Sequence, residues 1–174
     1  MVDVAGHIGM ALLWLAPTWR YIDDPRTTVA VVAAAAPFGM LPDVDLYLRR
    51  VFPTVQHHGV FHTVLAVTVA AVLVGPLLGR ALARGLDDRW LSPPVAARSA
   101  RVGSVVVWVA GLAHVFADML SAPDIAQAVE PFWPVYRQSL GFDVVWYNNP
   151  WANWGLLAAG VGIHAVLYWR ATGE

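Results

Sequence analysis

The sequence predicts an all-α integral membrane protein, a helical bundle of about five membrane-spanning segments. Its composition is strongly apolar: 58% of the 174 residues are hydrophobic and 13% are charged, which is about half the charged share of an average soluble domain. Apolar stretches also recur at roughly the 20 residues that cross the hydrocarbon core of a bilayer. These stretches cover residues 4–19, 28–41, 60–78, 102–120 and 151–169.

The five segments meet the required length unequally. The last three meet it comfortably, and the first is slightly short. The second ends in VAVVAAAAPFGML, which contains Pro37 and Gly39, so we expect either a kinked span or a re-entrant segment, which would leave four spans. Because the chain is too short for two domains of ordinary size, residues 1–174 are predicted to form one transmembrane helical domain.

Residues 123–150, PDIAQAVEPFWPVYRQSLGFDVVWYNNP, are long for a loop and rich in aromatic side chains. One interpretation is an interfacial segment that covers the helix ends. The other is a lid that admits an amphiphile from the outer leaflet, with Arg137 near its head group. The sequence alone leaves both interpretations open.

The arginines predict the orientation in the cell (inner) membrane. With five spans, three arginines fall on the side of the N-terminus: Arg49, Arg50 and Arg137. The other eight fall on the side of the C-terminus: Arg20, Arg26, Arg80, Arg84, Arg89, Arg98, Arg101 and Arg170. Because positive residues collect on the cytoplasmic side, the N-terminus is predicted outside and the C-terminus in the cytoplasm.

Charge and cysteine content exclude two kinds of function. The net charge is −1 and the eleven arginines are spread over the chain, so there is no basic face for nucleic acid. The chain has no cysteine, which rules out disulfides and thiolate metal sites.

Polar residues of four segments fall at one level of the predicted membrane, near the outer ends of the spans. They are His7, Asp43, Asp45, His57, His58, His62, His114 and Asp118. His164 is excluded, because about fourteen residues at 1.5 Å each place it roughly 20 Å from the outer end.

Local spacing supports the convergence. His114 and Asp118 are four residues apart and share one helix face. His58 and His62 would do so as well if the third span already begins there. Pro42 favours an extended start for the segment that follows it, in which Asp43 and Asp45 would point to one side.

Imidazole and carboxylate groups without thiolates are typical of zinc, manganese or iron sites. Ionisable groups within a membrane are costly, and one shared metal would satisfy them together. Each group taken alone also has an ordinary explanation. His7 fits an interfacial side chain, Asp43 and Asp45 fit a turn, and the remaining histidines fit a helix contact or a proton relay.

Five motifs in order resemble a known family: GHIGMAL, GMLPDVDLY, HHGVFHT, HVFADMLS and PFWP. The chain resembles the membrane-bound metal-dependent hydrolases, also called LexA-binding, inner-membrane-associated hydrolases. The resemblance implies the metal ligands His7, Asp43, Asp45, His57, His62, His114 and Asp118. Two positions depart from the family pattern, since His58 stands where the family has arginine and Phe61 where it has threonine.

The resemblance implies a hydrolase that activates water on one or two divalent metal ions, zinc first and manganese or iron as alternatives. His58 is assigned as the protonatable catalytic group, a general acid or a phosphate contact. The expected substrate is a phosphoester or other ester of an amphiphile such as a membrane lipid. Two other classes remain, a metal or proton transporter and a non-catalytic partner in a stress response. The nearly apolar inner halves of the third and fourth spans count against a transport pathway.

Overall fold

The computed structural model describes residues 3–121 and 126–173. These residues form α-helices and short 3-10 turns and contain no strand, only an isolated bridge between Ser121 and Val145. The α-helices are α1 (Val4–Leu15), α2 (Pro25–Ala35), α3 (Asp45–Leu48), α4 (Val64–Gly85), α5 (Pro93–Ala96), α6 (Ser99–Leu120) and α7 (Pro150–Thr172). The 3-10 turns are η1 (Ala16–Arg20), η2 (Ala36–Met40), η3 (Pro42–Val44) and η4 (Val60–His62). The all-α prediction is confirmed.

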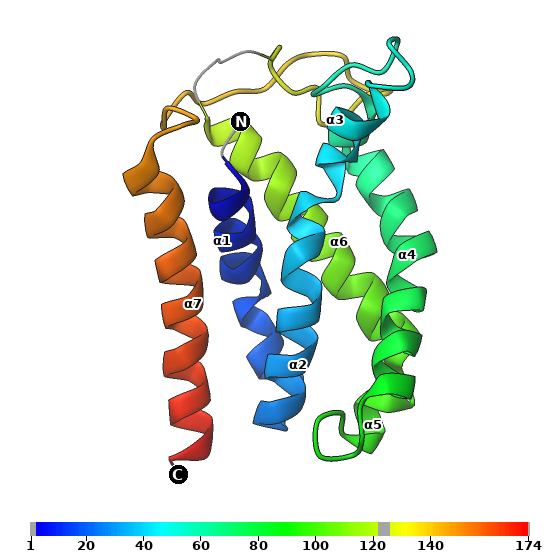
Figure 1. Cartoon of the computed structure of the whole chain (residues 1–174), viewed down its shortest axis with the longest axis vertical. Helices are drawn as coiled ribbons and strands as arrows, with labels where there is room; N and C mark the ends of the chain where they lie inside the picture. The colour runs from blue at the N-terminus through cyan, green and yellow to red at the C-terminus, as the bar shows by residue number, and fades with distance from the viewer. Residues whose placement is uncertain (1–2, 122–125, 174) are drawn as a thin grey trace.

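The five longer helices run along the long axis of the molecule (Figure 1). Helix α6 crosses the bundle and packs against both α4 and α1, and α7 packs on the outer side of α1. The N-terminus, α3 and the long loops lie at one end, which we call the upper end (Figure 1). The C-terminus and α5 lie at the other, the lower end.

Small residues allow α4 and α6 to approach closely. A Cβ atom added at Gly75 or Gly79 of α4 would collide with the backbone of α6, and one added at Gly103 would collide with the carbonyl oxygen of Gly75. In a membrane, where apolar burial does not drive helices together, close backbone packing of this kind supplies much of the attraction. The contact fixes the relative position of the two helices whose upper ends carry the polar cluster.

The number of spans is smaller than the five predicted. Two helices, α4 and α6, are long and apolar enough to cross a bilayer, and a third span is possible if the bent pair Pro25–Met40 and Pro42–Leu48 counts as one. This pair bends by 46°, as a kinked or re-entrant segment should. Helix α1 has only 12 residues, and α7, although it has 23, carries tryptophans, an asparagine and a histidine that lower its hydropathy.

Side-chain caps fix where the helices begin at the upper end. Asp3 caps α1 by accepting a hydrogen bond from the amide of Gly6 (2.9 Å). Thr63 caps α4 in the same way, accepting from the amide of Ala66 (3.0 Å). Such caps each contribute about 1 kcal/mol to helix stability. They also set the positions of His7, one turn into α1, and of His62, which precedes the cap of α4.

The segment 126–149 crosses the upper end of the bundle without forming a helix or strand (Figure 1). Its carbonyl at Pro131 accepts a hydrogen bond from Val64 at the start of α4 (2.8 Å), and its amide at Phe142 donates to Met119 at the end of α6 (2.7 Å). The segment therefore lies over the ends of both helices. Residues 123–125, where the predicted interfacial segment starts, lie outside the described residues.

Candidate metal centre

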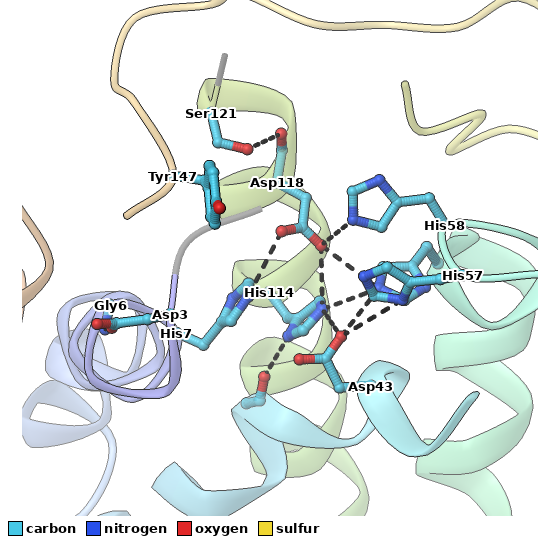
Figure 2. A network of polar contacts seen from close by, with 12 residues as sticks. Asp3, Gly6, His7, Asp43, His57, His58, His114, Asp118, Ser121 and Tyr147 are labelled. Carbon is cyan, nitrogen blue, oxygen red and sulfur yellow. Dashed lines mark hydrogen bonds and ion pairs between the residues drawn. The ribbon is translucent and has the colours of Figure 1, made fainter. Parts of the chain in front are cut away.

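The eight histidines and aspartates singled out from the sequence lie together at the upper end of the bundle (Figure 2). They come from α1, from η3 and α3, from the loop that leads into α4, and from the last two turns of α6. All eight are buried, with at most 8% of the residue surface exposed. His164 makes its polar contacts elsewhere, with the carbonyl of Leu12 and the indole of Trp19.

Helix α1 contributes His7 to the cluster, and α6 contributes His114 and Asp118. The ring of His7 stacks on that of His114, with centroids 3.7 Å apart and planes inclined by 12°. His114 and Asp118 share a face of α6, as their spacing predicts, and His114 Nε2 lies 3.1 Å from Asp118 Oδ2.

Asp43 and Asp45 reach the cluster from helical turns, so the prediction of an extended segment after Pro42 is wrong. Leu41 keeps helical dihedrals (φ −63°, ψ −41°), Pro42 opens η3, and Asp45 begins α3. A proline at the first position of a helical turn costs no hydrogen bond, so Pro42 restarts the helix in a new direction. The bend carries both carboxylates to the centre of the cluster.

The three neighbouring histidines lie on a loop and a short turn and not on the helix that follows. Helix α4 begins only at Val64, so the four-residue helical spacing considered for His58 and His62 does not apply. His58 has a φ of 60°, a left-handed conformation that is uncommon for a residue with a side chain. This backbone turn directs the rings of His57 and His58 to the same cluster (Figure 2).

Four ligand atoms face one another at the centre: Asp43 Oδ1, His62 Nε2, His114 Nε2 and Asp118 Oδ2. We call them the four-atom cage. The two nitrogens are 3.1 Å apart. Asp43 Oδ1 lies 3.4 Å from His62 Nε2 and 3.5 Å from His114 Nε2, and Asp118 Oδ2 lies 3.4 and 3.1 Å from the same nitrogens. Each of these five separations is close to the distance of about 3.3 Å between neighbouring ligand atoms that both lie 2.0–2.1 Å from one zinc ion.

The cage requires a positive charge. His114 Nδ1 lies 2.6 Å from the carbonyl oxygen of Gly39, and since a carbonyl only accepts, Nδ1 donates and Nε2 of the neutral ring presents a lone pair. That lone pair faces His62 Nε2 and carboxylate oxygens. A second proton on one of the two imidazoles, or a metal cation, is what makes this arrangement favourable.

A second layer of contacts orients the ligands. Asp45 Oδ1 lies 3.0 Å from His57 Nδ1. The other oxygen, Asp45 Oδ2, lies 3.2 Å from His62 Nδ1, and this second contact is not a well-directed hydrogen bond. His58 Nδ1 donates to the carbonyl of Gln127 (2.7 Å), which turns its Nε2 towards Asp118 Oδ2 at 3.7 Å. Carboxylates and carbonyls behind ligating histidines fix ring orientation in this way.

Unsatisfied polar atoms concentrate in the same place. In the described part of the chain, every buried side-chain nitrogen or oxygen atom that lacks a hydrogen-bond partner belongs to the cluster. These atoms are His7 Nδ1 and Nε2, Asp43 Oδ1, Asp45 Oδ2, His58 Nε2, His62 Nδ1 and both carboxylate oxygens of Asp118. Buried polar atoms are nearly always paired, and leaving them unpaired costs several kcal/mol in all. The donor set and its orphan atoms therefore fit a metal.

The remaining ligands offer room for a second cation. Asp118 Oδ1 points away from the cage and lies 3.4 Å from His7 Nε2, and His7, His114 and Asp118 form one set of mutually close ligand atoms. Asp43, Asp45 and His57 form another on the opposite side. Either set would hold a second ion beside the first, so the ligands suffice for one or two ions.

Two clefts flank the cluster. The larger, of about 630 Å³, is lined by Arg49 and His57 together with Pro53 and Gln127. The smaller, of about 200 Å³, is lined by His58, Glu130 and Trp133 among others. Burial lowers the pKa of His58 to about 4, so this ring is neutral at pH 7, which disfavours the general-acid role expected from the sequence.

Of three comparisons with known proteins, one finds a match. No curated protein and no solved structure matches the chain. A family model described as YdjM inner membrane protein matches residues 1–173. This match confirms the resemblance predicted from the motifs and agrees with the apolar helices. The chain belongs to the YdjM inner membrane protein family.

Proposed function

We propose that the protein is a membrane-embedded, metal-dependent hydrolase that acts on a phosphoester or other ester of an amphiphilic substrate. The observation that carries the proposal is the four-atom cage, in which two imidazole nitrogens lie 3.1 Å apart and each of two carboxylate oxygens lies 3.1–3.5 Å from both of them in a buried site. A divalent cation held there supplies Lewis-acid chemistry, activating water and polarising the ester.

Asp43, His62, His114 and Asp118 would hold the first ion, and zinc is the best fit because four nitrogen and oxygen ligands suit it. Manganese or iron would need further oxygen ligands. His7 with Asp118 Oδ1, or His57 with Asp43 and Asp45, would hold a second ion. Asp45 has the further task of orienting His57 and His62.

His58 is the proposed catalytic group. Its Nδ1 is committed to the carbonyl of Gln127, so its Nε2 lone pair is free to accept a proton beside Asp118. Arg49 lines the larger cleft next to His57. Its guanidinium group would contact an anionic substrate, which favours a phosphoester over an uncharged ester. This contact compensates for the arginine that the family carries at position 58.

The upper end faces the outer side of the membrane in this proposal. Eight of the eleven arginines lie on turns and helix ends at the lower end of the bundle. The other three lie at the upper end: Arg49, Arg50 and Arg137. The positive-inside rule then places the lower end in the cytoplasm. A site at the membrane surface suits a lipid-like substrate with a polar head group.

Transport is less well supported than hydrolysis. Among the described residues, all buried titratable side chains belong to the cluster at the upper end. A path for ions or protons would need such groups through the depth of the bilayer.

The proposal is tested by ester hydrolysis in detergent with added zinc or manganese. The substrates are a p-nitrophenyl phosphodiester, a p-nitrophenyl acyl ester and a short-chain phospholipid. We expect metal-dependent turnover by the wild type and by His164→Ala, none by His62→Ala, and a loss of about 10²-fold in kcat for His58→Gln with metal retained. Full metal occupancy without hydrolysis of any ester would contradict the proposal.

A further inference from the structure

A groove of about 260 Å³ lies at the lower end, away from the metal centre, where α1 and η1 meet α5 and α6. Its walls are almost wholly apolar and include Trp14, Leu15, Val105 and Val109. Two guanidinium groups line it as well, those of Arg98 and Arg101. The groove therefore combines a hydrophobic channel with a concentrated positive charge.

The two arginines are not explained by contacts within the protein. Arg98 donates from Nε to the carbonyl of Pro94 (3.1 Å), and both side chains are exposed. Across the described residues, no ion pair joins an arginine to a carboxylate. No carboxylate of residues 3–121 or 126–173 therefore neutralises the positive charges at the groove.

Their position also works against helix stability. Arg98 is the N-cap residue of α6, no side chain caps this helix, and Arg101 lies in its first turn. The N-terminus of a helix carries a partial positive charge, so cations there are unfavourable. The same partial charge adds to the two guanidinium groups in attracting an anion.

We propose that this groove binds one anionic phospholipid, with an acyl chain along the apolar wall and the phosphate at Arg98 and Arg101. Charge complementarity selects the anionic head group, because basic pockets between helices at a membrane surface bind such lipids. Tyr21 and Thr18, which also line the groove, add hydroxyl groups to its lining. The proposal does not depend on the reaction at the metal centre.

The test uses delipidated protein in detergent and native mass spectrometry with dioleoyl phosphatidylglycerol or dioleoyl phosphatidylcholine. We expect one phosphatidylglycerol to bind in preference to phosphatidylcholine. The variant Arg98→Gln/Arg101→Gln should bind phosphatidylglycerol about 25-fold more weakly, since each of the two arginines contributes about a factor of five near a membrane surface. The matched control is Arg80→Gln/Arg84→Gln, which removes the same charge from exposed positions near the lower end of α4.

Two further arms separate the lipid from simpler ligands. Val105→Trp narrows the groove and keeps both arginines, so it should also weaken phosphatidylglycerol binding. Glycerol phosphate, which lacks acyl chains, should not compete. Equal loss in the two double variants, equal affinity for both lipids, or displacement by glycerol phosphate would each overturn the proposal.

Discussion

Asp118 shows how one side chain reveals the chemistry of the site. Both of its oxygens are buried without a hydrogen-bond partner, yet they lie within 3.1–3.7 Å of nitrogens from four histidines. Such a carboxylate is unfavourable by itself and favourable beside a cation. The residue types and spacing in the sequence indicate this chemistry, because histidines and aspartates are rare in apolar spans.

Other contacts of the site could not be predicted from residue types. The carbonyls of Gly39 and Gln127 orient His114 and His58, but a backbone acceptor has no signature in the sequence. Arg49 lies one helical turn after Asp45, and only the folded loop brings it to the cleft beside His57.

Asp45 is predicted to act on metal binding through the histidines it touches. Asp45→Asn keeps the volume and removes the charge beside His57 and His62. Loss of such an orienting carboxylate typically costs about 10–100-fold in metal affinity, and competition with a chelating dye measures it. Asp88→Asn, at an exposed position, is the control. An unchanged affinity in Asp45→Asn would show that the carboxylate does not orient the ligands.

At the level of helices, the sequence predicts the apolar segments well and their ends less well. Each predicted span overlaps a helix, because apolar length is a strong signal. The turn that begins at Pro42 is helical and not extended. Proline disfavours helical dihedrals in the residue before it, here Leu41, and tertiary packing outweighs that preference. Composition also overestimates the number of spans, since it does not show that α1 ends after 12 residues.

The contact between α4 and α6 is predicted to depend on its glycines. Gly103→Ala places a methyl group against the backbone of α4 and should lower the free energy of unfolding by about 1–3 kcal/mol through overpacking. Thermal unfolding in detergent measures the change. Gly162→Ala on α7, where a Cβ atom meets nothing within 4 Å, should leave stability unchanged or raise it slightly. Equal behaviour of both variants would contradict the proposed packing.

For the whole molecule, the histidine and aspartate cluster lies at the upper end of the bundle, and eight of the eleven arginines belong to the lower end. The arrangement predicts a sidedness that can be measured directly, because the chain contains no cysteine. A single cysteine at exposed Pro53 should react with an impermeant maleimide added outside intact cells. One at exposed Asp88 should react only after permeabilisation. The reverse pattern would overturn the orientation and leave the site geometry intact.

The central claim is that the buried histidines and aspartates hold a divalent metal. Elemental analysis of the purified protein tests it, beside His62→Ala/Asp118→Ala and the control His164→Ala. The account predicts one or two equivalents of zinc, manganese or iron in the wild type and in the control, and none in the double variant. Absence of metal from all three after supplementation, or equal metal in all three, would contradict it.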